Sequence, residues 1–278
     1  MKNNFFRKFF IFWFFSSLHI SIAATFWGVI TFILLGLKFN FSLLIIFFIT
    51  FFVYNLNRMG IEESDKINYP ERVEFALKYG KLLLYLSIIF YIFAVLLAFL
   101  YNILVMLLTV LPFFIILLYD RVKKFFLIKS LIIGILWASS VILVAASLNT
   151  FNTTVFSFFL FVFLRDFINS IFFDIRDVSG DKVKGIKTLP VEIGVKKTLF
   201  LLKILNIFSG FLLIIFVIFK LLPVVAYSLI GLVFYNMIYY ELYKRKINKI
   251  LLYDVIADSE IYFAAFLIII TAKLFGIL

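Results

Sequence analysis

Residues 174–181 read Asp-Ile-Arg-Asp-Val-Ser-Gly-Asp and stand between two long apolar segments, residues 155–173 and 199–219. Apolar segments of about 20 residues are long enough to cross the roughly 30 Å hydrocarbon core of a membrane. Asp174, Asp177 and Asp181 occupy positions i, i+3 and i+7, so a continuing helix places the three carboxylates on one face. We expect such a face, at the mouth of a membrane helix, to hold hard divalent cations such as Mg²⁺ and, through them, phosphate oxygens.

The composition of the whole chain is that of a membrane protein. The 278 residues are 65% hydrophobic, 41 of them are phenylalanine, and the mean hydropathy is +1.16. Apolar runs continue unbroken rather than alternating in short segments, which argues against a transmembrane β-barrel. The chain has no cysteine, so thiol catalysis, disulfides and cysteine-ligated metals are excluded.

We therefore predict an all-α fold, a polytopic membrane helical bundle of about nine transmembrane helices. We expect one membrane-embedded domain over residues 1–278. The apolar run 11–35 is too long for a signal peptide and has no clean small-residue cleavage site, so we interpret it as the first helix. The predicted spans are residues 11–36, 39–57, 81–101, 103–119, 127–147, 155–173, 199–219, 222–241 and 255–276.

The charged residues predict the orientation of these spans. All but three of the 27 basic residues fall in or beside alternate loops, and the exceptions are Lys38, Lys220 and Lys273. By the positive-inside rule those loops are cytoplasmic. The formal net charge of +12 is explained in this way, so we expect membrane lipids and no nucleic acid as partners. The acidic residues lie on the same side, as expected for a polar catalytic mouth or for outer loops too short to carry charge.

The acidic segment and its continuation resemble the second aspartate-rich motif of the UbiA superfamily of intramembrane prenyltransferases. That motif is Asp-x-x-Asp-x-x-x-Asp, followed by Lys-x-x-Gly-x-Lys-Thr-Leu-Pro and a later glycine. The matching residues are Asp177, Gly180, Asp181, Gly185, Lys187, Thr188, Leu189, Pro190 and Gly194.

The first motif of that superfamily, Asn-x-x-x-Asp-x-x-x-Asp followed by Pro-x-Arg, matches after the second predicted span. The matching residues are Asn57, Asp65, Pro70 and Arg72. Ile61 stands where the middle aspartate is expected. Glu62 is turned about 100° from that position on a helix, so it could replace the missing carboxylate only if the helix unwinds near Gly60.

The resemblance implies a helical bundle around a central cavity that opens laterally to lipid. It implies Mg²⁺-dependent transfer of an isoprenyl group from a polyprenyl diphosphate to an aromatic or lipid acceptor, with release of diphosphate. The implied catalytic residues are Asp174, Asp177 and Asp181, and Asp174 is a further metal ligand or an acceptor-side base. The implied metal ligands are Asn57, Asp65, Asp177 and Asp181, and the implied diphosphate contacts are Arg72, Lys182 and Lys187.

Three further charged residues are candidates for the same site. Arg165 lies inside a predicted span, where an ionisable side chain is costly and defaults to a functional or paired role, and we expect it to face the same cavity as Asp174. Asp254 and Asp258 open the last span and either line the mouth or favour the helix N-terminus. The single histidine, His19, is expected to be a satisfied core residue rather than a metal ligand.

A different class of function remains open from the sequence. A non-catalytic transporter or an isoprenoid-binding or lipid-binding protein could use the same charged mouth, and the isoleucine at position 61 favours that alternative. We expect a multi-pass protein of the cell membrane with its active-site loops on the cytoplasmic side. The sequence gives no signal for an oligomeric state.

Overall fold

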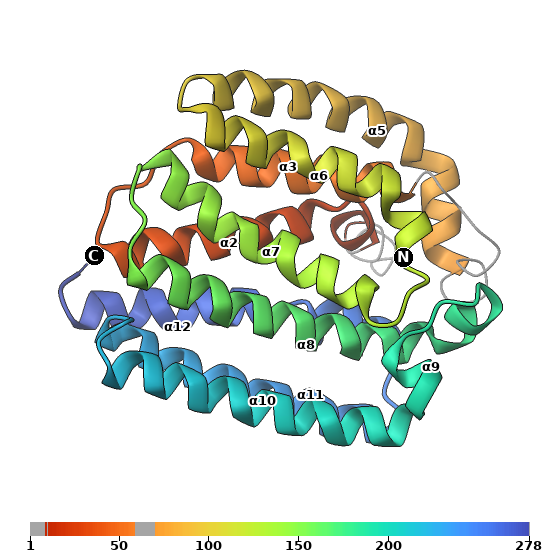
Figure 1. Cartoon of the computed structure of the whole chain (residues 1–278). Helices are drawn as coiled ribbons and strands as arrows, with labels where there is room; N and C mark the ends of the chain where they lie inside the picture. Colours follow the sequence, from red (N-terminus) through yellow and green to blue (C-terminus); the bar gives the residue numbers. More distant parts are fainter. Residues whose placement is uncertain (1–8, 10, 59–69, 278) are drawn as a thin grey trace.

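The computed structural model describes residues 9, 11–58 and 70–277, and its regular structure over these ranges is helical. Figure 1 shows long helices that run roughly side by side from one end of the molecule to the other. The helices are α2 (Leu18–Leu35), α3 (Ser42–Arg58), α5 (Pro70–Phe99), α6 (Ile103–Val122), α7 (Ile128–Ser147), α8 (Thr153–Val183), α9 (Leu189–Ile193), α10 (Val195–Ile218), η1 (Val224–Ile230), α11 (Gly231–Lys244), η2 (Ile250–Ala257) and α12 (Glu260–Leu274).

The helices confirm a polytopic membrane bundle. Within the described ranges, eight helices are long and apolar enough to cross a membrane, and α3 is a shorter apolar helix. In two cases the spanning unit has two parts, because η1 leads into α11 and η2 leads into α12. The prediction of about nine spans is therefore confirmed.

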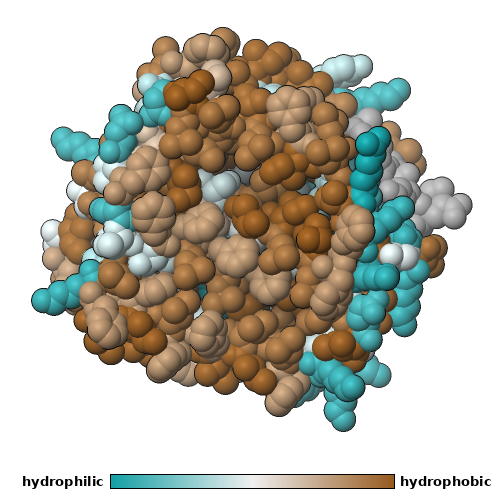
Figure 2. Space-filling model, viewed as in Figure 1, coloured by the Kyte–Doolittle hydropathy of each residue, from teal (hydrophilic) through white to brown (hydrophobic). Residues whose placement is uncertain are grey.

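The surface agrees with this interpretation. Figure 2 shows hydrophobic side chains across the broad central face, whereas hydrophilic side chains gather mainly along the right-hand edge. Exposed leucine, isoleucine and phenylalanine side chains are frequent on α5, α6 and α10, for example Leu96, Leu107 and Phe211. Side chains of this kind suit contact with lipid acyl chains rather than water.

Two helices differ from their predicted bounds in a way that shapes the site. α8 continues to Val183, ten residues beyond the predicted end, and the chain leaves the helix only near Gly185, whose φ is +65°. α5 begins at Pro70 rather than near residue 81. Proline suits the first helical position because its missing N–H has no intrahelical partner there. Both extensions place residues that we expected in loops on rigid helices.

The first predicted span is interrupted. Ser17 has a φ of 72°, and α2 begins at the next residue, Leu18. A positive φ breaks helical geometry, so residues 11–36 do not form one continuous helix.

α8 is the central helix of the bundle and packs against α2, α7 and α10. Its contact with α7 is close at Gly134, where an added Cβ would lie 3.1 Å from the carbonyl oxygen of Phe163. Small residues let helix backbones approach in membranes, where dispersion contacts supply much of the association energy. Figure 1 places α9, the start of α5 and the C-terminal end of α8 at one end of the bundle, and the C-terminus at the other. The charged residues of interest gather toward the first of these ends.

Candidate functional site

A polar cavity of about 250 Å³ opens between α2, α3, α5, α7, α8, η2 and the start of α12. Its wall is rich in charge. The lining carboxylates are Asp166, Asp174, Asp177, Asp254 and Asp258, and the lining cations are Arg58, Arg72, Lys129 and Arg176. Asn57, Asn169 and Ser170 add neutral polar groups. An arrangement of this kind can bind an anionic group and balance its charge.

The extended α8 carries Asp174, Asp177 and Asp181 on one continuous helix, as the spacing predicted. Asp174 and Asp177 line the cavity. Asp181 is buried and does not line it, but it contacts a lysine that does. That lysine is Lys129, at the start of α7. Its Nζ lies 2.8 Å from Asp174 Oδ1 and 3.1 Å from Asp181 Oδ2.

Asp174 is held on both of its oxygens. Lys129 pairs with Oδ1, and the hydroxyl of Ser130 donates to Oδ2 at 2.9 Å. The carboxylate is almost fully buried, with 1% of its surface exposed. Charge-assisted contacts of this length offset much of the cost of removing a carboxylate from water. α7 therefore completes the acidic face of α8.

Asp177 is paired with its neighbour in sequence. Arg176 donates from Nε to Oδ1 at 2.8 Å and from Nη2 to Oδ2 at 2.9 Å. The same guanidinium lies 3.6 Å from Asp254 Oδ1 and over the ring of Phe173. A planar guanidinium matches a carboxylate in this bidentate manner, and it also matches a phosphate.

Arg72 reaches the cavity from the first turn of α5. Its Nη2 donates to Asp254 Oδ1 at 3.0 Å, and Asp254 is 1% exposed. The structure thus brings Arg72 and Asp254, both predicted from sequence, to one wall beside Asp177. Asn57, near the end of α3, lines the same cavity. Asp65 and Glu62 lie outside the described residues.

Two predicted diphosphate contacts are placed elsewhere. Lys182 and Lys187 are exposed, and neither lines the cavity. Lys182 is in the last turn of α8, and Lys187 follows Gly185 in the turn that leads to α9. Their contact with diphosphate remains a prediction from the resemblance.

The expectation for Arg165 was wrong, because it does not line the cavity. It is 1% exposed and points into the junction of α8, α10, α11 and α12. Its Nε donates to Glu260 Oε1 at 2.9 Å, and its Nη1 donates to Asn206 and Ser209. A buried guanidinium requires a countercharge and full hydrogen bonding, and Glu260 of α12 supplies the charge.

Asp258 lines the cavity one helical turn beyond Asp254 and contacts His19 of α2. Its Oδ2 lies 3.1 Å from His19 Nε2. The structure agrees that His19 is a buried residue, with 4% of its surface exposed. The expectation that His19 is only a core residue is incomplete, because His19 also lines the polar cavity.

Sequence reasoning gave no functional role to Lys129 and Arg176. Lys129 appeared only as one of the basic residues flanking a cytoplasmic loop. The available signal was its position at the start of a span on the same membrane side as the acidic motif. Arg176 stands inside the motif, between two of its aspartates, and positively charged residues there suit an anionic ligand.

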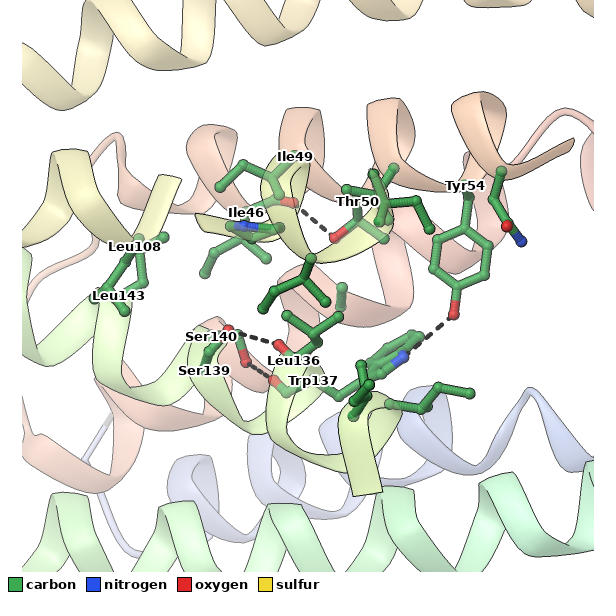
Figure 3. Close-up of a pocket in the computed structure, with 18 of the residues that line it drawn as sticks. Ile46, Ile49, Thr50, Tyr54, Leu108, Leu136, Trp137, Ser139, Ser140 and Leu143 are labelled. Carbon is green, nitrogen blue, oxygen red and sulfur yellow. Dashed lines mark hydrogen bonds between the residues drawn. The ribbon is translucent and has the colours of Figure 1, made fainter. Parts of the chain in front are cut away.

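An apolar pocket of about 150 Å³ adjoins the polar cavity between α2, α3, α6 and α7. The two share lining residues that include Tyr54, Asn57 and Trp137. Figure 3 shows Tyr54 and Trp137 pointing toward one another, and the indole N–H donates to the tyrosine oxygen at 3.2 Å. Leu108, Ile46 and Leu143 are among the residues farther from this pair. The charged polar cavity therefore adjoins an apolar pocket along a shared wall.

The polar cavity offers the type of ligand atom that Mg²⁺ prefers. Mg²⁺ prefers oxygen ligands and keeps several waters, and the cavity supplies carboxylate oxygens and the amide oxygen of Asn57. Among the described residues, no three acidic or histidine side chains come close enough to hold an ion by themselves. Lys129 and Arg176 lie against the carboxylates instead.

The chain is similar to known membrane proteins. A digeranylgeranylglyceryl phosphate synthase of Sulfurisphaera tokodaii (strain DSM 16993 / JCM 10545 / NBRC 100140 / 7) is 30% identical over 164 residues, which cover 55% of this chain and 56% of that protein. The match thus spans about half the length of that relative.

Solved structures show the same fold. One concerning digeranylgeranylglyceryl phosphate synthase in membranes has a TM-score of 0.61 and 22% identity, and covers 96% of this chain and 99% of its own. A UbiA homolog from Archaeoglobus fulgidus bound to GPP and Mg²⁺ has a TM-score of 0.61 and 16% identity, and covers 92% of this chain and 99% of its own.

The match to a protein family covers more of the chain than the match to the Sulfurisphaera tokodaii protein. Residues 21–250 match the UbiA prenyltransferase family, a range that extends from α2 into η2 and contains both acidic motifs. The chain belongs to the UbiA prenyltransferase family.

Proposed function

We propose that this protein transfers a prenyl group from a prenyl diphosphate to a lipid hydroxyl within the membrane and releases diphosphate. One observation carries the proposal: the polar cavity with its acidic and basic wall continues, past Tyr54 and Trp137, into an apolar pocket. A prenyl diphosphate has the same two halves, a head with several negative charges and an apolar chain. We place the head beside Arg72 and Asp177 and the chain in the apolar pocket.

The acceptor we favour is geranylgeranylglyceryl phosphate. The support is the relative from Sulfurisphaera tokodaii, a digeranylgeranylglyceryl phosphate synthase, and the fold shared with a structure concerning such a synthase. Adding a second geranylgeranyl group to geranylgeranylglyceryl phosphate gives the product in that name. The proposed acceptor is therefore an alcohol rather than an aromatic ring, and the bond formed is an ether.

The proposed ligands of Mg²⁺ are Asn57, Asp65, Asp177 and Asp181. Asp174, which also lines the cavity, contacts Lys129 and Ser130. When bound, Mg²⁺ neutralises the diphosphate and makes it a better leaving group. Arg72 and Arg176 add fixed positive charge at the same wall, because each already pairs with a carboxylate of the cavity and can share its donors with phosphate oxygens. Positive charge placed where negative charge develops lowers the barrier to breaking the allylic C–O bond.

The apolar pocket contributes by excluding water. A reactive allylic centre held among Ile49, Ile133 and Trp137 meets few water molecules, so capture by the acceptor competes well with hydrolysis. The proposal also places the polar cavity at the cytoplasmic side of the cell membrane, where most basic residues lie.

The test is a direct assay of the protein reconstituted in lipid nanodiscs. We expect geranylgeranyl diphosphate and geranylgeranylglyceryl phosphate to give the diether and one pyrophosphate per ether, and to give neither when EDTA removes divalent cations. Saturable binding of geranylgeranyl diphosphate without pyrophosphate release would contradict catalysis and favour an isoprenoid-binding protein. Pyrophosphate release with an aromatic acceptor alone would keep the transferase and reject the lipid acceptor.

A further inference from the structure

A second polar region lies deeper in the same cavity, beyond the wall that we assign to diphosphate. It contains His19 of α2, Asp166, Asn169 and Ser170 of α8, and Asp258, which precedes α12. Along α8, Asp166 precedes Asp174 by eight residues, about 12 Å at 1.5 Å per residue. Nothing in the diphosphate chemistry uses these residues, and polar groups at such depth in a membrane bundle are costly.

Several polar atoms of this region have no protein partner. His19 Nδ1, Asp166 Oδ2 and Ser170 Oγ are buried and have no hydrogen-bond partner among the described residues. All three residues are less than 9% exposed. Buried polar atoms in folded proteins nearly always have a partner, so these atoms have hydrogen-bonding capacity for water or for a polar ligand.

Asp258 is the member of this region with the most defined geometry. His19 Nε2 lies 3.1 Å from Oδ2, and the same histidine is fixed at its backbone, where its carbonyl oxygen accepts a 2.6 Å hydrogen bond from the hydroxyl of Tyr262. The ring of Phe14 packs against the imidazole at 4.7 Å between centroids. The side chain of Asp258 is 18% exposed and lines the cavity, so the carboxylate is both fixed and reachable.

Among the described residues, three of the other four carboxylates of the cavity are paired with lysine or arginine, and Asp166 is the exception. Lys129 pairs with Asp174, Arg176 pairs with Asp177, and Arg72 pairs with Asp254. The carboxylates of Asp174, Asp177 and Asp254 are thus engaged by charged donors, whereas Asp258 contacts a histidine and lies open to the cavity. We therefore distinguish the three cation-paired carboxylates, which suit binding of the diphosphate, from Asp258, which can accept a proton.

We propose that Asp258, positioned by His19, accepts the proton of the acceptor hydroxyl as the new ether bond forms. This inference rests on the proposed function. As the allylic C–O bond breaks, its electron pair leaves with diphosphate. A lone pair of the acceptor oxygen forms the new bond to the same carbon, and the hydroxyl proton passes to the carboxylate of Asp258. Asp258 lines the same cavity one helical turn beyond Asp254, and the proposed place of that carbon is in the adjoining apolar pocket.

The position also explains why Asp174 is not the base. Both of its oxygens are engaged, by Lys129 and by Ser130, and it is 1% exposed. The resemblance alone left Asp174 as either a metal ligand or an acceptor-side base. The geometry favours Asp258 for the second role.

The test uses Asp258→Asn in the reconstituted full-length protein, with geranylgeranyl diphosphate and geranylgeranylglyceryl phosphate as probes. Asparagine keeps the shape and an oxygen that accepts the hydrogen bond from His19, so a purely structural link between α2 and α12 survives. Loss of a general base typically costs 100-fold or more in rate. We expect ether formation to fall about 100-fold, while the KM for geranylgeranyl diphosphate changes less than about threefold.

The products provide a second readout. Breaking the allylic C–O bond needs no base, so Asp258→Asn continues to release pyrophosphate, and geranylgeraniol from water capture replaces the ether. His19→Gln keeps an N–H donor and is expected to stay near wild type, whereas His19→Leu shifts the products toward geranylgeraniol. Asp120→Asn, at an exposed carboxylate of α6, is the matched control and changes nothing.

Three results overturn the inference. Asp258→Asn with wild-type ether formation makes the His19 contact purely structural. Equal loss of pyrophosphate release and ether formation places Asp258 in the diphosphate site. If Asp166→Asn loses ether formation and Asp258→Asn does not, Asp166 is the residue that accepts the proton. The wild type, assayed in parallel, reports separately on the proposed function, because failure of that function removes pyrophosphate release from the wild type itself.

Discussion

Lys129 Nζ lies 2.8 Å from Asp174 Oδ1, so a lysine of α7 contacts the acidic face of α8 where the family resemblance implies a metal site. The same amine lies 3.1 Å from Asp181 Oδ2. One fixed cation therefore balances part of the negative charge of the second motif. Asp181 is a proposed ligand of Mg²⁺, so the ion would compete with the lysine for that carboxylate.

This arrangement predicts two opposite effects of Lys129→Gln. Without Mg²⁺ the variant is less stable than the wild type, because two buried carboxylates lose their cation. With Mg²⁺ the freed carboxylates attract the ion more strongly, since Mg²⁺ affinity follows ligand charge. We expect a lower Tm in EDTA and half-maximal stabilisation at a Mg²⁺ concentration about three- to tenfold lower, roughly 0.6–1.4 kcal/mol of binding free energy.

The measurement is a Mg²⁺ titration of Tm in detergent, which needs no substrate. Lys124→Gln is the matched control, because Lys124 lies in the same loop region and is exposed. An unchanged Mg²⁺ midpoint in Lys129→Gln would show that the lysine and the ion do not compete for the same carboxylates.

Asp177 and Asp181 are predicted to be required for turnover. Asp177→Ala and Asp181→Ala should each abolish pyrophosphate release and leave the protein folded, since each removes a charged oxygen from the proposed metal site. Steady-state rates at saturating geranylgeranyl diphosphate, with size-exclusion profiles as a folding check, decide the point. Activity above about a tenth of wild type in either variant would remove that residue from the set of metal ligands.

The buried pair of Arg165 and Glu260 predicts a stability effect that is separate from catalysis. Arg165→Met leaves Glu260 buried without its cation, and breaking such a pair by removing one partner costs about 3–5 kcal/mol. Arg165→Met combined with Glu260→Met removes both charges and should recover most of that loss. Arg121→Met, at an exposed arginine of α6, is the control. Unfolding in increasing SDS measures each variant, and additive losses in the double variant would exclude the pairing as the source.

The sequence predicted the main features of the fold because they follow from local pattern. Apolar runs long enough for the membrane set the number of helices, and the i, i+3, i+7 spacing set the acidic face of α8. The start of α5 was missed because residues 70–80 mix charged and apolar side chains. A search for long apolar runs does not detect a helical segment of this composition. It nevertheless begins with Pro70, a known start signal.

The candidate site was predicted less completely, because its pairs join distant parts of the chain. Lys129 and Asp174 are 45 positions apart, and His19 and Asp258 are 239 apart. No spacing rule links such residues; only the packing of α7 on α8 and of α2 on α12 brings them together. Arg165 illustrates the reverse error. Its depth in a membrane helix correctly indicated a paired charge, but the helix face that carries it points to α10 and α12 rather than to the cavity.

The orientation of the bundle is predicted from charge, and α8 alone can test it. Thr153 and Ser179 are exposed residues near opposite ends of this helix, which continues to Val183. Twenty-six residues at 1.5 Å each separate them by about 39 Å, more than a hydrocarbon core. The wild type has no cysteine, so single cysteines at these positions are the only thiols. In intact cells or sealed vesicles of known orientation, we expect a membrane-impermeant maleimide to label Ser179→Cys from the cytoplasmic side and Thr153→Cys from the other. Labelling of both from one side would contradict a membrane-spanning α8, and the reversed pattern would place the charged cavity on the outer face.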